Sequence, residues 1–221
     1  MNSAQLIDPT SAAIVVGGTL VATFLRCGIG DVRAAVGALA ALARNKFDAR
    51  HAKAELAIQV REIRQDGFVR AAPHHFGDSE FDDVTDALIE TRRIDALHAA
   101  HARHRAIRAE TSERAIQALS QAAELAPVFG LAGTLVSLSQ LRVDGAVSDL
   151  TGAIGMAVLT TLYGLLLGNL VFAPLARLVE RAAQAEERER QQLVDWLEAE
   201  LVDEMPGARA PVRRAPAGAA A

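Results

Sequence analysis

Leu150–Arg177 reads LTGAIGMAVLTTLYGLLLGNLVFAPLAR and has no charged side chain before Arg177. As a helix rising 1.5 Å per residue, its 27 uncharged residues, Leu150–Ala176, extend about 40 Å, which exceeds the ~30 Å hydrocarbon core of a bilayer. The alternative is a core helix of a soluble protein. A chain of 221 residues can hardly surround such a helix on all sides. The stretch therefore predicts a membrane-spanning helix at 150–176.

Two shorter apolar stretches predict two further spans. Pro9–Leu25 (PTSAAIVVGGTLVATFL) and Leu125–Leu141 (LAPVFGLAGTLVSLSQL) each hold 17 uncharged residues, near the lower limit for crossing a bilayer. Because they accompany the longer stretch, we interpret both as spanning helices, at 9–25 and 125–141. The predicted fold class is an all-α integral membrane protein with three transmembrane helices and long helical extensions on the cytoplasmic side.

Positive charges set the predicted orientation of these spans. Arginine and lysine gather in residues 26–124 and after the third span, whereas the connection 142–149 has one arginine and residues 1–8 have none. By the positive-inside rule, we expect 26–124 and 177–205 in the cytoplasm. The tail 1–8 and the loop 142–149 are then outside. The Pro- and Ala-rich end, 206–221, is predicted to be a disordered tail.

The cytoplasmic regions are predicted to be helical. Residues 31–65 are rich in Ala, Leu, Arg and Glu and end near Gly67, which can cap a helix. The segment AAPHHFG (71–77) interrupts this pattern, and Ser79 is expected to begin a helix that reaches about Glu124. The helix after the third span is expected to make apolar contacts through Leu178, Leu193, Leu197 and Leu201.

No catalytic motif is present, so an enzyme is not expected. The sequence has no Gly-rich phosphate loop, serine elbow or HExxH pair, and its single Cys27 excludes an intrachain disulfide. His98, His101 and His104 share a three-residue spacing that could bring two imidazoles to one metal ion. Because arginines are interleaved, a solvated face is the favoured interpretation. We expect no metal and no cofactor, and a net charge of −4 gives no indication of a nucleic-acid partner.

Small and hydroxyl residues mark the second and third spans. Glycines let helices approach closely, and GLLLG is a GxxxG pattern, so helix packing is predicted at Gly130, Gly133, Gly164 and Gly168. Thr134, Thr160 and Thr161 each can bond to a carbonyl of their own helix, which is more often a structural role than a functional one. Neither span contains Asp, Glu, Lys, Arg or His. Hydroxyls can line an ion path but cannot carry a proton across it, so if this protein conducts ions, a partner must supply the acid.

The order of these residues resembles a known family. APVFGLAGTLVSLSQL (126–141) followed by GMAVLTTLYGLLLGNLVFAPLARLVE (155–180) resembles the last two spans of the MotA/TolQ/ExbB proton-channel family. TTLYG (160–164) is most similar to the MotA, PomA-like flagellar stator branch. The opening IDPTSAAIVVGGTLVATFL (7–25) is similar to the second span of that branch, and the chain starts just before it. This start implies either a stator subunit shortened at its N-terminus or a three-span variant.

The resemblance implies an ion-channel subunit of the flagellar motor stator in the bacterial inner membrane, which converts ion flow into torque. The implied assembly is a homo-oligomeric ring around a single-span, MotB-like protein whose membrane aspartate takes and releases the ion. The flagellar rotor and the lipid bilayer are the other implied partners. The implied ion is H⁺, with Na⁺ as an alternative, and no cofactor is implied.

The resemblance also assigns residues. It implies that Thr134 and Thr161 face the ion path, with Thr160 as their neighbour. It implies that Pro127 and Pro174 bound the membrane helices and couple ion passage to cytoplasmic movement.

The sequence also suggests contacts with the rotor, and it leaves two alternative functions open. Arg70 and Glu80 are nominated for contact with the rotor, with solvated charge as the alternative. An ExbB/TolQ-like energiser of envelope transport and a non-conducting membrane scaffold are the alternative functions.

Overall fold

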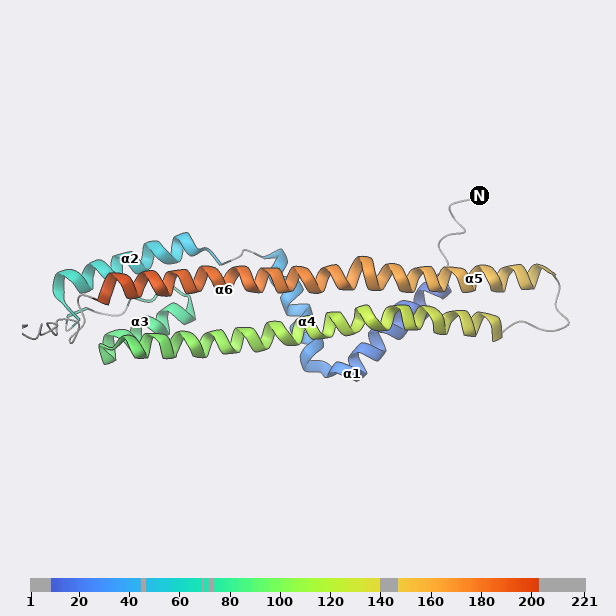
Figure 1. Cartoon of the computed structure of the whole chain (residues 1–221), viewed down its shortest axis with the longest axis horizontal. Helices are drawn as coiled ribbons and strands as arrows, with labels where there is room; N and C mark the ends of the chain where they lie inside the picture. The colour runs from blue at the N-terminus through green and yellow to red at the C-terminus, as the bar shows by residue number, and fades with distance from the viewer. Residues whose placement is uncertain (1–8, 45–46, 69, 72–73, 140–146, 203–221) are drawn as a thin grey trace, which may run out of the picture. The chain divides into compact units, whose positions relative to one another are not determined.

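The structure, a computed structural model, describes residues 9–44, 47–68, 70–71, 74–139 and 147–202, and all regular elements among them are helices (Figure 1). They are α1 (Pro9–Ala43), α2 (Ala49–Asp66), α3 (Ser79–Thr91), α4 (Ile94–Ser139), α5 (Val147–Leu166), the π-helical turn η2 (Leu167–Phe172) and α6 (Ala173–Leu201). The predicted tails, 1–8 and 206–221, and most of the predicted loop 142–149 lie outside the described residues.

Three helical stretches of the described chain are long and apolar enough to cross a membrane. They are Pro9–Ala43, Ile94–Ser139 and Thr151–Leu201. Each of them overlaps one predicted span, although residues 140 and 141 of the second lie outside the described residues. The all-α fold class with three such helices is therefore confirmed.

The helices form two compact units, each considered by itself. The first comprises residues 1–46 and 108–185 and holds the predicted spans, so we call it the span unit. The second comprises residues 47–107 and 186–221. Because all six histidines of the chain lie in it, we call it the histidine unit. Helices α4 and α6 contribute residues to both units.

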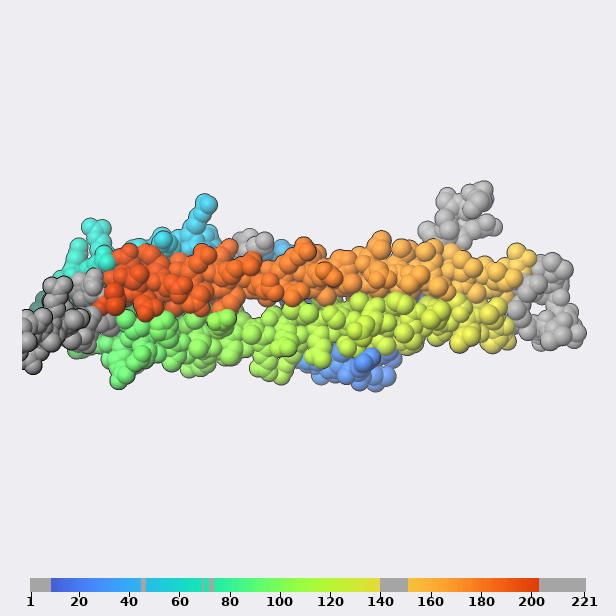
Figure 2. All heavy atoms as spheres, in the orientation of Figure 1, coloured from blue at the N-terminus to red at the C-terminus, as the bar shows by residue number. Residues whose placement is uncertain are grey.

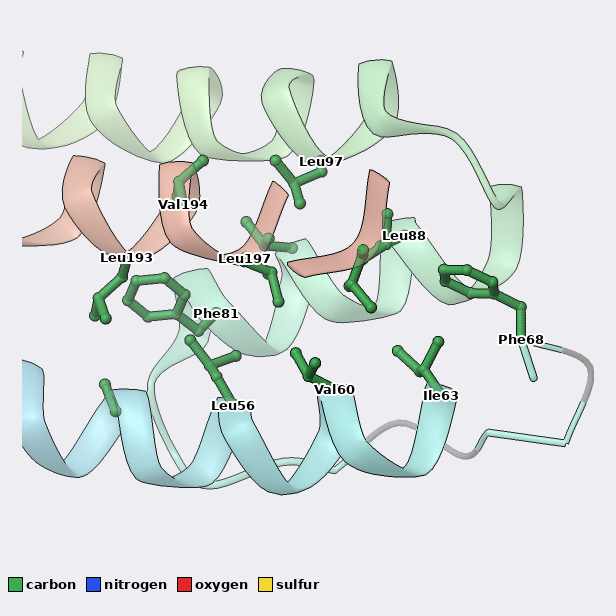
Figure 3. Close-up of a cluster of buried hydrophobic side chains, with 13 residues drawn as sticks. Leu56, Val60, Ile63, Phe68, Phe81, Leu88, Leu97, Leu193, Val194 and Leu197 are labelled. Carbon is green, nitrogen blue, oxygen red and sulfur yellow. The ribbon is translucent and has the colours of Figure 1, made fainter. Parts of the chain in front are cut away.

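The histidine unit has an apolar core built by four helices (Figure 3). α2 presents Leu56, Val60 and Ile63, whose spacing of three or four residues puts them on one helix face. The other helices contribute Phe81 and Leu88 from α3, Leu97 from α4, and Leu193, Val194, Leu197 and Leu201 from α6. Of the four leucines predicted to make apolar contacts after the third span, Leu178 is 50% exposed and the other three are buried.

The predicted continuous helix from Ser79 to Glu124 is wrong, because the chain breaks at Arg92. Arg92 has a φ of 55°, and its N–H closes onto the Leu88 carbonyl to end α3. On an unbroken helix, Leu88 and Leu97 would lie about 180° apart. Both are almost fully buried in the same core, at 1% and 0% exposure. The break allows both leucines to face that core.

The helix expected over 31–65 is also two helices. α1 ends at Ala43, and α2 begins after Asp48, whose Oδ1 accepts hydrogen bonds from the backbone N–H groups of Arg50 and His51. The predicted glycine cap is confirmed, since Gly67 ends α2 with a φ of 74° and donates its N–H to the Ile63 carbonyl. Asp78, one residue before the expected start, caps α3.

In the span unit, α1 changes direction within its length (Figure 1). The backbone is non-helical at Gly28, where φ is 81° and ψ is 171°, a conformation that favours glycine. After this bend, Ala35 of α1 packs against Ala115, Ala118 and Leu119 of α4 and Ala176 and Val179 of α6. Small side chains at this contact let the three helices approach closely.

Candidate functional site

An open groove of about 440 Å³ lies between α4 and α5 in the span unit. Its lining is apolar apart from two hydroxyls, those of Thr134 on α4 and Thr161 on α5. The other lining residues are Leu138 of α4 and Ile154, Ala157, Val158, Leu162 and Leu165 of α5. The structure thus brings together two of the three threonines that the resemblance places on an ion path.

Both groove hydroxyls use their protons within their own helices. Thr134 Oγ1 donates to the Leu131 carbonyl at 2.7 Å, and Thr161 Oγ1 donates to the Ala157 carbonyl at 3.3 Å. A hydroxyl that donates in this way still has lone pairs that accept. Toward the groove, the two threonines can therefore present oxygen acceptors to a water molecule or a cation.

Thr160 lies in a different place from the other two threonines. It is fully buried, and its Oγ1 also donates to the Ala157 carbonyl, at 2.9 Å. A Cβ added to Gly133 would lie 2.8 Å from the Thr160 side chain. Thr160 therefore packs against α4 and does not line the groove.

Three glycines bring the backbones of α4 and α5–η2 together beside the groove. Figure 2 shows the atoms of the two helices in contact side by side. A Cβ on Gly130 would lie 2.9 Å from the Thr160 carbonyl oxygen, and one on Gly164 would lie 2.6 Å from that of Ala126. A Cβ on Gly168 would lie 2.6 Å from the Ala123 carbonyl oxygen. No side chain larger than hydrogen fits at these positions without a backbone shift.

The two prolines lie at either side of one irregular turn. Pro127 is inside α4, and its ring lies 3.1 Å from the position that a Cβ on Gly168 would take. Pro174 is the second residue of α6, directly after η2. In η2, the Ala173 N–H bonds to the Gly168 carbonyl, five residues back. A π-turn widens a helix locally and is frequent at functional sites.

The histidine unit holds a buried polar network that the sequence did not predict. His101 is 4% exposed, and its Nδ1 lies 2.6 Å from Glu80 Oε1 while its Nε2 lies 3.0 Å from Gln191 Oε1. The Gln191 amide is oriented by its own donation to Asp195 Oδ1. Both imidazole nitrogens thus lie within hydrogen-bond distance of side-chain oxygens from other helices.

Arg190 completes this network. Its guanidinium donates to Glu80 Oε2 at 2.8 Å, to Asp78 Oδ2 at 3.0 Å and to Glu186 Oε1 at 2.9 Å, and it lies 4.0 Å from the centre of the Phe47 ring. Burial works to lower the pKa of Arg190. The hydrogen bonds and charges of its acidic neighbours outweigh that effect and raise the pKa.

The network corrects the solvated-face interpretation for His101 but not for His98, which is exposed. His101 is buried, while His98 pairs with Glu198 at 3.2 Å and His104 with Asp83 at 2.8 Å. Each of the three histidines thus lies beside a different carboxylate: His101 beside Glu80, His98 beside Glu198 and His104 beside Asp83. Within the described residues, no group of three or more His, Cys, Asp or Glu could hold a metal ion.

The two side chains nominated for rotor contact differ in exposure. Arg70 is exposed, but Glu80 is only 1% exposed and is held by His101 and Arg190. Glu80 is therefore not at the surface of the histidine unit. No local sequence pattern indicates this burial, because its partners lie 21 and 110 residues away.

Residues 75–192, more than half of the chain, match the MotA/TolQ/ExbB proton channel family. The chain belongs to this family. It is 25% identical over 193 residues to the chemotaxis protein PomA of Vibrio alginolyticus, a match that covers 86% of this chain and 76% of PomA.

Two solved structures share the fold of this family member. One is the flagellar MotAB stator complex from Bacillus subtilis, with a TM-score of 0.77, 17% identity, and coverage of 89% of this chain and 79% of that one. The other is C. jejuni MotAB, with a TM-score of 0.76, 16% identity, and coverage of 94% and 88%. The predicted family resemblance is confirmed.

Proposed function

We propose that this chain is the proton-channel subunit of a flagellar stator and converts ion flow into motor torque together with a MotB-like partner. Membership of the proton channel family and the similarity to PomA and to MotAB structures support this role. The observation that carries it is the α4–α5 groove, in which two threonine hydroxyls stand in an otherwise apolar lining.

The groove has the properties expected of half an ion path. Thr134 and Thr161 offer oxygen acceptors and carry no charge. A charged side chain at the same place in an apolar membrane segment would cost much more free energy. None of the eight lining residues is acidic or basic. A proton crossing here therefore needs a titratable group from elsewhere, and a single-span partner with a membrane aspartate would supply it.

The exposed apolar surface beside the groove suits such a partner. Val158 is 63% exposed, Leu162 40% and Leu165 47%, and they follow one face of α5 with Ile154 and Thr161. A helix laid in this groove would cover them and hold its aspartate near the two hydroxyls. We propose that further copies of this chain form a ring around the partner and enclose the other sides of the ion path.

Movement of the cytoplasmic region is assigned to the turn between the two prolines. Single π-turns inside helices are frequent at functional sites, and η2 lies between the groove helix α5 and α6. Pro127 contacts this turn across from α4. Exposed Arg70 remains the nominated contact with the rotor, and burial excludes Glu80 from that role.

In this proposal the chain is a multi-pass protein of the bacterial inner membrane, with the histidine unit in the cytoplasm. It catalyses no reaction and needs no cofactor. The transported ion is H⁺, or Na⁺ if the pocket shared with the partner selects it.

The test is ion flow in a host that lacks its own stator genes. The chain and its candidate single-span partner are produced separately and together, and proton entry is measured as a fall in internal pH after an imposed pH gradient. We expect entry and swimming only with both proteins. A partner whose membrane aspartate is replaced by asparagine is expected to abolish both.

The other functions give different results in the same assay. Proton entry that energises a TonB- or TolA-like protein, without swimming, would mean an ExbB/TolQ-like role. Normal membrane insertion of both proteins with no proton entry would contradict the channel.

A further inference from the structure

The second part of α1 has one face that no described part of the chain covers. Its inner face packs on α4 and α6 through Ala35, with Ala38, Leu39 and Leu42 beside it. On the outer face, Ile29 is 65% exposed and Val36 is 63% exposed. Large aliphatic side chains left this open usually meet another apolar surface.

Two arginines accompany these aliphatic side chains. With 100° per residue, Val36 lies about 20° from Ile29 around the helix, and Arg33 lies about 40° from it on the other side. Arg44 is the first residue after the helix, which ends at Ala43. Arg33 and Arg44 are exposed. Within the described part of the chain neither guanidinium has an acidic partner. The outer face thus combines an apolar strip with the positive charge of Arg33, and a second positive charge, that of Arg44, follows at the end of the helix.

The bend at Gly28 determines where this face lies. The first part, Pro9–Cys27, has 19 residues and is about 28 Å long, which suffices to cross the hydrocarbon core. The second part runs across α4 and α6 instead of along them (Figure 1). Because α4 and α6 continue helices that cross the membrane, a helix laid across them runs along the membrane plane.

The contacts also fix its depth. On α6 it meets Ala176 and Val179, which flank the first charge after the long apolar stretch, Arg177. On α4 it meets Ala115, Ala118 and Leu119, which precede the apolar stretch that begins at Leu125. Both helices thus leave the hydrocarbon at this level, on the side where the arginines gather.

We infer that the outer face of residues 29–43 rests on the headgroup layer of the bilayer, and that Arg33 on this face and Arg44 at its end bind the phosphates of anionic lipids. Ile29 and Val36 reach into the acyl boundary, as apolar side chains of interfacial helices do. Paired arginines favour anionic over zwitterionic lipid. This inference requires that the chain spans the membrane and is independent of the ion it conducts.

The test uses fluorescence quenching by lipid in the full-length protein. Cys27→Ser removes the single cysteine, and Val36→Cys then carries an environment-sensitive fluorophore. The labelled protein is reconstituted into vesicles that contain brominated phosphatidylglycerol or brominated phosphatidylcholine. Ile58→Cys, exposed in the histidine unit, is the matched control site. Ile29→Cys is the second site if Val36→Cys reduces the yield of folded protein.

We expect loss of fluorescence at residue 36 with either lipid, a larger loss with phosphatidylglycerol, and none at residue 58. Arg33→Gln with Arg44→Gln is expected to reduce the loss with phosphatidylglycerol to that with phosphatidylcholine. Arg61→Gln with Arg93→Gln, an equal change of charge in the histidine unit, is expected to leave the preference intact.

Three results would overturn the inference. Equal fluorescence at residues 36 and 58 would show that the face does not meet lipid. A disulfide between two copies through Val36→Cys would show that a second copy covers it. Quenching at residue 36 that is the same with both lipids, with or without the arginines, would show membrane contact without recognition of anionic headgroups.

Discussion

Gly164 of α5 lies so close to Gly130 of α4 that a Cβ added to Gly164 would be 2.9 Å from the Gly130 Cα. The same Cβ would lie 2.6 Å from the Ala126 carbonyl oxygen, so backbone atoms surround the position. Backbone cannot give way as a flexible side chain can. This contact sets the separation of the two helices whose threonines line the groove.

Gly164→Ala is therefore expected to push α5 away from α4. Overpacking of this kind costs about 1–3 kcal/mol. We expect a lower thermal unfolding temperature for the detergent-solubilised protein and reduced proton entry with the partner. Gly155→Ala is the matched control, since nothing lies within 4 Å of a Cβ there. An unchanged unfolding temperature for Gly164→Ala would contradict the close contact.

Thr161→Val tests the hydroxyl path without changing the shape of the side chain much. The substitution removes the groove hydroxyl and its bond to the Ala157 carbonyl. We expect proton entry to fall at least about tenfold, equivalent to ~1.4 kcal/mol in the barrier, with normal membrane levels. Thr23→Val makes the same change in α1, outside the groove, and should leave proton entry intact. Equal activity of the two variants would remove Thr161 from the path.

The span helices could be predicted from the sequence because a bilayer demands long uncharged stretches, and such stretches are visible in one dimension. The groove was predictable in part. Its α5 lining, Ile154, Val158, Thr161 and Leu165, follows a spacing of three or four residues that marks one helix face. That spacing could not indicate which face of α5 is covered, because the packing of α1 and α4 decides it.

The buried polar network of Glu80, His101 and Arg190 could not be predicted from the sequence. Glu80, His101 and Arg190 come from three helices and lie 21 to 110 residues apart, so no local pattern links them. The break at Arg92 was missed in the same way, because only the shared burial of Leu88 and Leu97 requires it.

Arg190→Met is expected to destabilise the histidine unit strongly. The change leaves Glu80, 1% exposed, without its arginine. Removal of one partner from a buried ion pair typically costs about 3–5 kcal/mol. Trp196, the only tryptophan, packs on the core of this unit, so its fluorescence during urea unfolding measures the loss.

Arg93→Met is the matched control for that experiment. Arg93 pairs with Asp95, but both side chains are largely exposed, so the pair is worth at most about 1 kcal/mol. Similar urea midpoints for the Arg93 and Arg190 variants would contradict the structural role of the buried network.

The His75–Asp86 pair predicts a pH dependence of stability. The hydrogen bond and charge of Asp86 raise the pKa of His75, whose Nε2 lies 3.0 Å from Asp86 Oδ1. The folded state therefore binds this proton more tightly than the unfolded state. The contribution is fully present below the unfolded pKa and is lost as pH rises through the folded pKa.

We expect the urea midpoint of the parent protein to fall more than that of His75→Gln between about pH 6 and 8, the range in which histidine titrates. Asp86→Asn should give the same flatter profile, since it removes the other half of the pair. Parallel profiles for the parent and both variants would contradict the assignment.

The most direct test of the central claim is disulfide cross-linking between the groove and the candidate partner's membrane span. In a Cys27→Ser background, Val158→Cys places a thiol in the groove, and Leu25→Cys places one on exposed α1 outside it. Each is combined with single cysteines along the partner's span. We expect cross-links from residue 158 to partner positions around the aspartate and none from residue 25. Cross-linking from residue 25 alone, or from neither residue in cells that swim, would contradict it.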